Sequence, residues 1–435
     1  SAFLTMNKRS FCFNEQGTGK TASAIWASDF LLKQGIIKRV LIICPLSIMD
    51  SAWRADLFNF AMHRSVDIAY GTPAKRRQIL ANDADYVVIN YDGVEIIADD
   101  IAASGFDLII VDEATHYKNV QTRRWKSLNK LIKDDTWLWM MTGTPAAQSP
   151  LDAYGLAKLV NPTGVPRYFG SFRDQVMFKL TRFKWEVKEN ATETVFNALR
   201  PAIRFTKEEC LDLPEMVYIK RKVELTPQQK KYYKELKTRM VMQAAGEEVT
   251  AVNAAVNMNK LLQISAGAVY TDNGQALEFD IKHRYKVLME AIQETSSKVL
   301  VFVPFKHTIG ILSRRLTSDG ISNAVIQGDV PVNKRTEIFR AFQEQSDPRV
   351  LVVQPAAASH GVTLTAANTV VWWAPTSSLE TYLQANARIH RAGQKNKCTV
   401  VQLHGAPVEQ HVYRLLDDRI DVHTKVIDLY KELLD

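Results

Sequence analysis

Near its start the chain reads Gly17-Thr18-Gly19-Lys20-Thr21. An apolar segment precedes this stretch, and a helix-like segment over Thr21–Lys33 follows it, with Gly35 just beyond its end. Glycines let backbone N–H groups close around phosphate oxygens, and the first turn of a helix adds a favourable dipole. The stretch therefore predicts a phosphate-binding loop, in which Lys20 bridges the β and γ phosphates of a nucleotide and the Thr21 hydroxyl is a ligand of magnesium.

A pair of adjacent carboxylates, Asp112 and Glu113, follows the strand predicted over Leu108–Val111. Two acidic groups at the end of a buried strand are unfavourable unless they are solvated, paired or close to a metal ion. With a phosphate loop upstream, we expect Asp112 to hold magnesium through water and Glu113 to polarise the attacking water. The alternative interpretation is an ordinary turn at the end of a strand.

A small turn rich in hydroxyl groups follows the next predicted strand, and it reads Thr142-Gly143-Thr144-Pro145. Beside the acidic pair, such a turn can sense the γ phosphate and relay its state. Taken alone, the same residues are typical of a plain turn.

Length and composition indicate a globular protein of two domains. The chain has 435 residues, 46% of them hydrophobic and 23% charged, and cores rarely grow beyond about 250–300 residues. Its net charge of +8 permits a polyanionic partner without requiring one. The longest apolar runs are far shorter than the ~18 residues that span a bilayer, so we expect no membrane partner. The four cysteines form no CxxC pair, which argues against a metal cluster or a disulfide framework.

Apolar runs of strand length recur in two series, one within residues 1–164 and one within residues 283–435. Because the runs are continuous rather than alternating, they predict parallel strands buried on both faces, with helices between them. The predicted fold is therefore α/β, with two lobes that each contain a parallel sheet. The expected strands are Phe11–Asn14, Val40–Cys44, Val66–Ala69, Tyr86–Asn90, Leu108–Val111, Trp137–Met141, Val299–Val303, Ala324–Ile326, Val350–Val353, Thr369–Trp373 and Thr399–Leu403.

Residues 165–282 follow a different pattern, in which helical spacing dominates and basic residues mix with aromatic ones. Lys230, Lys231 and Lys234, for example, surround two tyrosines. We interpret this region as helical protrusions together with the linker between the lobes. A solvated helical face and a nucleic-acid-binding track are both consistent with such charge.

In the second lobe, Gln384, Arg388 and Arg391 recur at spacings of four and three residues. This spacing predicts a helix over Leu379–Ala392 with all three side chains on one face, ended by Gly393 as a left-handed cap. Two arginines at the edge of a domain can reach a triphosphate that is bound elsewhere. The alternative is a basic surface helix.

Taken in order, these motifs resemble those of the SWI/SNF-type DNA translocases, which belong to the superfamily-two motor ATPases. Two positions depart from the family pattern, because Thr115 replaces its usual histidine and Thr363 its usual asparagine. The matching segments are Asn14–Thr21, Cys44–Ser47 with Trp53, Asp112–Thr115 with Lys118 and Asn119, Thr142–Pro145, Phe205–Lys207 with Asp212–Pro214, Gly361–Thr365 and Gln384–Gln394.

The resemblance implies two RecA-like lobes with helical protrusions, ATP and magnesium in the cleft between the lobes, and duplex DNA held across both. Lys20, Thr21, Asp112 and Glu113 are implied as ATP and magnesium residues. Arg388 and Arg391 are implied as the arginines that complete the site from the second lobe. Further nucleotide contacts are expected from Gly361 and Gln384, and DNA contacts from Lys118, Asn119, Lys230, Lys231 and Lys234.

The family's adenine-reading glutamine motif has no match in the 16 residues that precede Gly17. We therefore expect that the chain either discriminates adenine poorly or lacks part of its first lobe. Comparable hydrolysis of ATP and GTP is the expected sign of poor discrimination.

The function expected from the sequence is ATP hydrolysis stimulated by DNA, coupled to movement along double-stranded or branched DNA without obligatory strand separation. We expect a monomer that acts in the cytoplasm, on a nucleoid or in a nucleus. A strand-separating helicase on DNA or RNA is the alternative. A nucleic-acid-binding module with a vestigial ATPase and a generic phosphate-loop kinase are the remaining interpretations, and the kinase leaves the second lobe unexplained.

Overall fold

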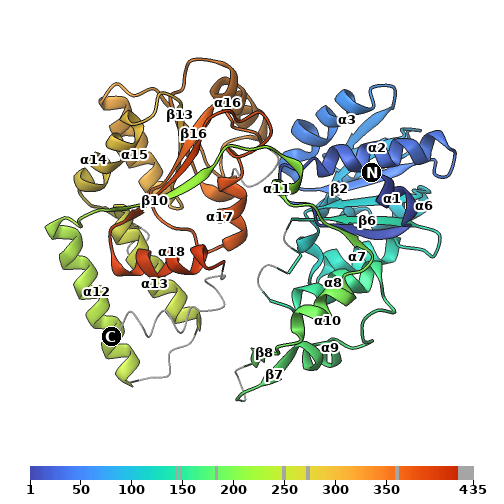
Figure 1. The fold of residues 1–435 in the computed structure, drawn as a ribbon, viewed down its shortest axis with the longest axis horizontal. Coiled ribbons are helices and arrows are strands. Elements are labelled where there is room, and N and C mark those ends of the chain that lie inside the picture. The colour runs from blue at the N-terminus through green and yellow to red at the C-terminus, as the bar shows by residue number, and fades with distance from the viewer. Residues whose placement is uncertain are drawn as a thin grey trace. The chain divides into compact units, whose positions relative to one another are not determined.

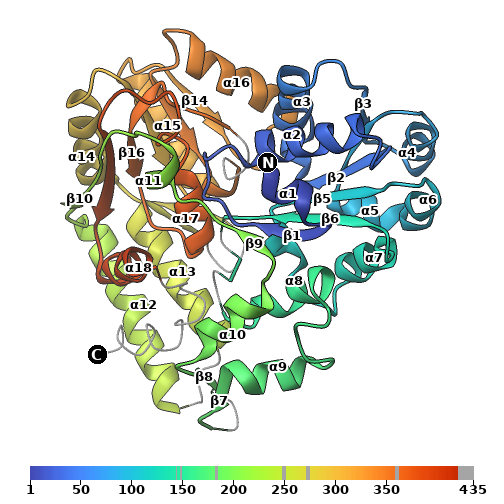
Figure 2. The same ribbon diagram turned by 45° about the vertical axis from the view of Figure 1, so that its right-hand side comes forward.

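The computed structural model describes residues 1–143, 145–146, 149–181, 185–246, 251–270, 275–357 and 362–419. The chain forms two compact units, Ser1–Leu211 and Asp212–Asp435, here called lobe one and lobe two. Each lobe contains one parallel sheet with helices on both faces (Figures 1 and 2). The predicted α/β class with two parallel-sheet lobes is therefore confirmed. The helical region expected over residues 165–282 is divided between the two units.

Lobe one is built on a seven-stranded sheet with the order β3-β4-β2-β5-β6-β1-β9. All its strand pairs are parallel, and Val40, on the third strand in this order, lies between Tyr86 and Leu108 of the two neighbouring strands. The strands are β1 (Arg9–Cys12), β2 (Val40–Cys44), β3 (Val66–Ala69), β4 (Tyr86–Asn90), β5 (Leu108–Asp112), β6 (Trp137–Met141) and β9 (Ala202–Ile203).

Alternate residues of this sheet enter two hydrophobic clusters, one on each face. Leu41 and Ile43 join the cluster of helices α4 to α10, whereas Val40 and Ile42 join the cluster of α1, α2 and α3. Side-chain caps help to start some of these helices, as where Thr72 accepts a hydrogen bond from the amide of Lys75. The helices are α1 (Ala2–Met6), α2 (Lys20–Lys33), α3 (Ala55–Phe60), α4 (Pro73–Leu80), α5 (Tyr91–Ile96), α6 (Ala98–Ala103), α7 (Arg123–Leu131), α8 (Asp152–Val160), α9 (Phe169–Val176), α10 (Ala191–Ala198) and α11 (Lys207–Cys210), together with the π-helix Met49–Arg54.

Lobe two is built on a six-stranded parallel sheet with the order β10-β17-β16-β13-β15-β14. Its strands are β10 (Met216–Lys222), β13 (Lys298–Phe302), β14 (Asn323–Ile326), β15 (Val350–Val353), β16 (Ala367–Trp372) and β17 (Cys398–His404). Its helices are α12 (Pro227–Gly246), α13 (Ala251–Ala266), α14 (Lys282–Gln293), α15 (Lys306–Ser318), α16 (Val332–Glu344), α17 (Leu379–Asn386) and α18 (Pro407–Asp417). Within the described ranges, no helix combines the length and apolar character needed to cross a membrane.

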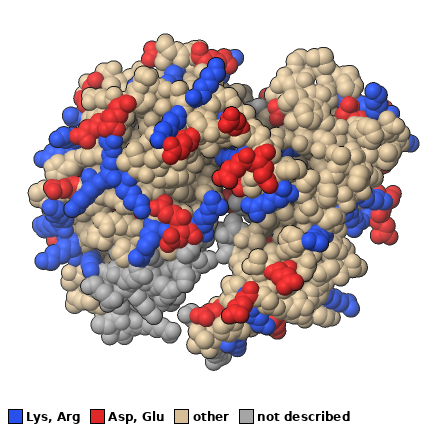
Figure 3. Space-filling view, viewed as in Figure 1, with Lys and Arg blue, Asp and Glu red and all other residues tan. Residues whose placement is uncertain are grey.

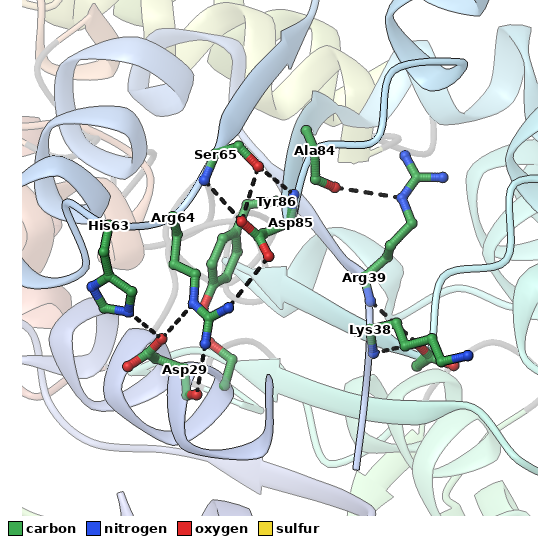
Figure 4. A network of polar contacts seen from close by, with 11 residues as sticks. Asp29, Lys38, Arg39, His63, Arg64, Ser65, Ala84, Asp85 and Tyr86 are labelled. Carbon is green, nitrogen blue, oxygen red and sulfur yellow. Dashed lines mark hydrogen bonds and ion pairs between the residues drawn. The ribbon is translucent and has the colours of Figure 1, made fainter. Parts of the chain in front are cut away.

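Ion pairs connect the strands at the amino-terminal edge of the lobe-one sheet (Figure 4). Asp29 of α2 accepts a hydrogen bond from Arg64 Nε at 2.7 Å, and Arg64 Nη1 reaches Asp85 at 3.4 Å. The other carboxylate oxygen of Asp85 accepts from the backbone amide of Ser65 at 2.9 Å. Burial alone would lower the pKa of Arg64, but the hydrogen bond and charge of Asp29 raise it. These contacts tie the starts of β3 and β4 to α2.

The same edge holds a third carboxylate with hydrogen-bond partners, that of Asp107, which immediately precedes β5. Its Oδ2 atom accepts hydrogen bonds from the backbone amides of Lys38 at 2.7 Å and Arg39 at 3.2 Å. The guanidinium group of Arg39 donates to several backbone carbonyl oxygens, including that of Ser104 at 2.9 Å. The amino ends of β2 and β5 are therefore fastened together by groups that satisfy one another.

Candidate active site

Three sequence motifs meet at the carboxyl edge of the lobe-one sheet. Strand β6 pairs with β1 on one side and with β5 on the other, so the segments that follow these strands are neighbours. A Cβ atom added to Gly143 would lie 3.7 Å from the carbonyl oxygen of Asn14, which places the turn after β6 against the phosphate loop. The carboxyl edge of an open parallel sheet is where ligands bind in such folds. Thr144 lies outside the described residues.

The phosphate loop has the backbone shape that its sequence predicts. Gly17 and Gly19 adopt φ angles of +85° and +79°, in the left-handed region that glycine adopts without strain. Helix α2 begins at Lys20, and Gly35 ends it with φ +68°. Lys20 Nζ donates to the carbonyl oxygens of Asn14 and Glu15 at 2.9 and 3.2 Å. The loop thus presents backbone amides at the start of a helix, an arrangement suited to phosphate.

The loop is also fastened to the end of lobe one. Strand β9 pairs with β1, and beyond it the amide of Phe205 donates to Asn14 Oδ1 at 3.1 Å. Glu15 bonds the same segment twice, because its amide donates to the Phe205 carbonyl at 2.9 Å and its carboxylate accepts from the Lys207 amide at 3.2 Å. The segment that leads out of lobe one therefore contacts the residues that hold Lys20.

Asp112 is the last residue of β5 and is only 8% exposed. Its Oδ2 atom accepts a hydrogen bond from the indole N–H of Trp53 at 3.1 Å, and its Oδ1 atom accepts from the amide of Glu113 at 3.0 Å. Burial raises the pKa of Asp112, and the nearby charge of Lys20 and these two hydrogen bonds offset only part of that effect. The structure therefore brings Asp112 close to Lys20, as the sequence predicts.

Glu113 has a left-handed backbone, with φ +49° and ψ +56°. For a residue other than glycine this region is unfavourable by roughly 1–2 kcal/mol, and such outliers concentrate at functional sites. The hydroxyl of Tyr91 donates to the Asp112 carbonyl oxygen at 2.7 Å, which fixes the peptide that joins the two acidic residues. Strain at a residue held this firmly supports a functional role.

The acidic edge is suited to a magnesium ion that is shared with a nucleotide. Among the described residues there is no cluster of three or more His, Cys, Asp or Glu side chains that could hold a metal ion by themselves. Magnesium usually combines one or two carboxylates with waters and substrate phosphates rather than a cage of protein ligands. The buried Asp112 carboxylate beside the phosphate loop is a donor of that kind, because a cation would offset the cost of its burial.

In lobe two, the helix expected over Leu379–Ala392 is shorter than predicted. Helix α17 ends at Asn386, so Gln384, Arg388 and Arg391 do not share one helix face, and that prediction is wrong. Arg388 Nε donates to the Gln384 carbonyl oxygen at 3.0 Å. If the helix continued, this oxygen would instead accept a hydrogen bond from the backbone amide of Arg388. The backbone amide of Arg388 instead bonds Ala385 in a tighter turn. The arginine side chain therefore replaces the helical hydrogen bond.

The two arginines of lobe two have different environments. Arg388 is 1% exposed and also donates to the Val362 carbonyl oxygen at 3.2 Å. Arg391 is half-buried and reaches the hydroxyl of Thr363, one of the two positions that depart from the family pattern, at 3.4 Å. Gly393 has φ +93°, left-handed as predicted, although it lies in a turn rather than at a helix end. Gly361 lies outside the described residues.

Gln384 and Gln394 are both buried, and both bond within lobe two. The Gln384 amide donates to Glu380 at 3.1 Å. Gln394 Nε2 donates to the carbonyl oxygens of Ile389 and Ala367, each at 2.9 Å, and so holds the arginine turn against β16. Gln394 is therefore an anchor for this motif.

The expected DNA-contacting residues lie on both lobes. Lys118 forms an ion pair with Asp152 at 3.2 Å, and Asn119 accepts a hydrogen bond from the amide of Gln121 at 2.9 Å. Lys230, Lys231 and Lys234 are exposed on α12. On the face drawn in Figure 3, basic and acidic side chains are interspersed. Charge on that face therefore does not by itself define a DNA track.

Two residues at this site carried no role in the sequence interpretation. Trp53 belongs to a matched motif, but its contact with Asp112 spans 59 positions along the chain. Tyr91 follows β4 and reaches a carbonyl oxygen 21 positions away. Neither contact has a spacing signal, because each depends on how non-consecutive strands pair.

A two-lobed α/β fold with a phosphate loop and an acidic pair at one sheet edge defines a nucleotide-binding protein of the helicase-like type. Residues 6–269 match the family model for the SNF2-related domain, and residues 283–393 match that for the helicase conserved C-terminal domain. The chain belongs to the SNF2-related family, the SWI/SNF type of superfamily-two ATPases.

Two curated relatives are distant and much longer than this chain. An uncharacterized ATP-dependent helicase of Mycoplasma genitalium is 26% identical over 90% of this chain, which spans 37% of that relative. The nuclear protein STH1/NPS1 of Saccharomyces cerevisiae is 25% identical over 96% of this chain, which spans 33% of it. A solved SWI2/SNF2 ATPase core of Sulfolobus solfataricus in complex with dsDNA is 21% identical, with a TM-score of 0.46, and the match covers 99% of this chain and 93% of that one.

Proposed function

We propose that the chain is a motor that hydrolyses ATP and translocates on double-stranded or branched DNA without obligatory strand separation. The observation that carries the proposal is the meeting of the phosphate loop, Asp112 and Glu113 at one edge of the lobe-one sheet. Membership of the SNF2-related family supports the coupling of this chemistry to DNA. The nuclear and helicase names of its relatives support a site of action on chromosomal or other cellular DNA.

In the proposed mechanism, lobe one binds the nucleotide and prepares the attacking water. The backbone amides of the loop bind phosphate oxygens, and Lys20 leaves its carbonyl partners to contact the β and γ phosphates. Asp112 and Thr21 would hold magnesium, which when bound would neutralise charge on the phosphates. Glu113 accepts a hydrogen bond from the attacking water and orients it toward the γ phosphorus. Thr142, Gly143 and Thr144 transmit the state of the γ phosphate.

Lobe two completes the site in this proposal. Arg391 stabilises charge on the transferring phosphoryl group, a contribution worth about 10³–10⁵ in rate for such arginines. Arg388, which is buried and bonded to Gln384 and Val362, holds the turn that carries Arg391. Gly361 and Gln384 supply further contacts near the nucleotide. Closure of the lobes then becomes the step that permits hydrolysis.

DNA binding is proposed to be mainly electrostatic. Lys118, Asn119 and the α12 lysines Lys230, Lys231 and Lys234 are the proposed contacts with the phosphate backbone. Contacts of this kind give binding that tolerates sequence and weakens with salt. We further propose that the chain acts as a monomer, in the cytoplasm, on a nucleoid or in a nucleus.

The direct test is an ATPase assay with no DNA and with single-stranded, double-stranded and branched DNA. The expected result is hydrolysis that double-stranded or branched DNA stimulates most. Absence of hydrolysis under every condition would refute the enzymatic proposal. A parallel measurement with GTP checks the expectation of poor adenine discrimination, which a strict preference for ATP would contradict.

A strand-separating helicase is the second candidate, and the match of residues 283–393 to the helicase C-terminal domain favours it. The same ATP chemistry serves both functions. Displacement of a labelled strand from a plain duplex, with strongest stimulation by single strands, would favour the helicase. Displacement of a bound triplex strand from an intact duplex would favour translocation.

The roles of the two arginines can be separated. Arg391→Ala is expected to lose about 10³-fold or more of the turnover rate while nucleotide affinity changes only a few-fold. Arg388→Ala should lower the melting temperature in addition to the turnover rate, because it removes a buried guanidinium group that donates hydrogen bonds to two carbonyl oxygens. If Arg391→Ala lowers affinity and stability together with turnover, Arg391 is a structural residue instead.

A further inference from the structure

We propose that Trp53 and Tyr91 are positioning residues that together aim the acidic pair at the nucleotide. The proposal rests on the function proposed above, because it concerns the same site. Neither side chain is assigned a role in the chemistry. Their contacts form one continuous series that runs from the Trp53 indole through the Asp112 carboxylate to the peptide between Asp112 and Glu113, and ends at the Tyr91 hydroxyl.

The first observation is the backbone that carries Trp53. Residues Met49–Arg54 form a π-helix, a rare geometry that occurs frequently at functional sites. Trp53 is fully buried in the cluster between the sheet and α2, yet its indole N–H reaches the Asp112 carboxylate at 3.1 Å. A fully buried tryptophan needs a partner for this donor. Here the partner is the proposed magnesium-binding carboxylate.

The second observation is how the Asp112 carboxylate is held. Trp53 fixes Oδ2 and the Glu113 amide fixes Oδ1, so the carboxylate cannot rotate without losing a hydrogen bond. An ionised carboxylate accepts about four hydrogen bonds, so both oxygens keep lone pairs for water around a cation. Partners of this kind orient metal ligands and cost about 10–100-fold in metal affinity or activity when removed.

The third observation is the clamp on the peptide between the two acidic residues. Its N–H group donates to Asp112 Oδ1, and its C=O group accepts from Tyr91. With both ends of the peptide held, Glu113 stays in its left-handed conformation, and its carboxylate is presented in one direction.

Two matched pairs of substitutions test the proposal. Trp53→Phe removes the indole N–H, and Trp139→Phe makes the same change in the same cluster, where the indole donates to the Asn7 carbonyl at 3.1 Å. Tyr91→Phe removes the clamping hydroxyl. Tyr86→Phe, at the other end of β4, removes a hydroxyl that bonds Ser28 at 2.9 Å. Each control loses the same volume as its partner substitution and one hydrogen bond away from the acidic pair.

The measurements are the kcat and KM for ATP, the Mg²⁺ concentration that gives half-maximal rate, and the rise in melting temperature that Mg²⁺ produces in the presence of ADP. All rates are corrected for the folded fraction. Trp53→Phe is expected to lower kcat about 10–100-fold, to raise the required Mg²⁺ concentration, and to reduce the Mg²⁺-dependent rise in melting temperature. Tyr91→Phe is expected to lower kcat with KM and the Mg²⁺ requirement nearly unchanged. The controls should change stability alone.

The outcomes separate the two proposals. If the wild-type chain does not hydrolyse ATP, the proposed function fails and this inference fails with it. If the wild type hydrolyses ATP but Trp53→Phe and Trp139→Phe behave alike in Mg²⁺ dependence, Trp53 is only a core residue. Equal kcat values for Tyr91→Phe and Tyr86→Phe would likewise overturn the role of Tyr91 while leaving the proposed function intact.

Discussion

Carboxylates at the two edges of the lobe-one sheet have opposite environments. At the amino edge, Asp29 and Asp85 face the guanidinium group of Arg64, and Asp107 accepts two backbone amides. At the carboxyl edge, Asp112 bonds two neutral donors, and burial raises its pKa. One edge satisfies its charges and stabilises the lobe. The other keeps a buried acid and a strained Glu113 ready for a cationic ligand, a division between stability and activity that is common in enzymes.

The largest effect is expected at the carboxyl edge, from Glu113→Gln. Loss of a group that orients the attacking water should lower the ATPase rate by about 10²–10⁴-fold, because general-base contributions fall in that range. Nucleotide affinity, measured with a fluorescent ATP analogue, should stay within a few-fold, and the melting temperature should not fall. Substantial hydrolysis by this variant would remove Glu113 from its role and weaken the contrast between the edges.

An intermediate effect, on stability alone, is expected at the amino edge. Arg64→Met should lower the free energy of unfolding by about 1–3 kcal/mol, because it removes charged hydrogen bonds to two half-buried carboxylates. The rate per folded molecule should not change.

The control for Arg64→Met is Arg54→Met. This substitution breaks the ion pair of Arg54 with Asp50, in which the two side chains are 54% and 71% exposed. Exposed pairs of this type contribute about 0–1 kcal/mol. Chemical denaturation of both variants decides the matter. Equal stability losses would mean that the amino-edge network is no more than surface charge.

The smallest expected change in stability gives the sharpest test, because it compares the two ends of one strand. Folding raises the pKa of Asp112, because burial disfavours the ionised carboxylate. At neutral pH, ionisation of Asp112 therefore lowers the free energy of unfolding. Asp112→Asn removes this unfavourable contribution but turns an NH2 group toward one of the two N–H donors that the carboxylate satisfies, so the free energy of unfolding should change by less than about 1 kcal/mol, while turnover is lost. Asp107→Asn should instead lower stability and preserve turnover.

Thermal unfolding at neutral pH, without nucleotide or Mg²⁺, measures both of these variants. Excess Mg²⁺ with ADP should then stabilise the wild type more than Asp112→Asn, since a ligand stabilises the state that binds it. If both substitutions destabilise the chain equally, the two edges do not differ in kind.

Much of lobe one could be predicted because its signals are local. Strands β2 and β4 begin and end where the apolar runs do, and the glycines of the phosphate loop adopt the predicted left-handed conformation. Strand β10 was missed because it lies at the sheet edge with exposed, basic residues rather than an apolar run. A continuous apolar run identifies strands that are buried on both faces, but it does not identify an exposed strand at the edge of a sheet.

The arginine motif shows the limit of periodicity. Residues 384, 388 and 391 have helical spacing, but the side chain of Arg388 takes the carbonyl oxygen on which the helix depends. Spacing predicts which residues share a face if the helix continues through them. It does not predict that a side chain will take the hydrogen bond that the helix needs. The contacts of Trp53 and Tyr91 could not be predicted for a different reason. Their hydrogen-bond partners depend on the order of the strands in the sheet, which the local sequence does not specify.

The pairing of β1 with β9 has a consequence for how the protein is made. The phosphate loop lies near the start of the chain, but the groups that fasten Asn14 and Glu15 belong to Phe205 and Lys207. During synthesis, the loop therefore acquires these partners only after the chain has grown by the further 191 residues that separate Asn14 from Phe205. Until then a growing chain has the nucleotide motif in its sequence without the completed lobe that holds it.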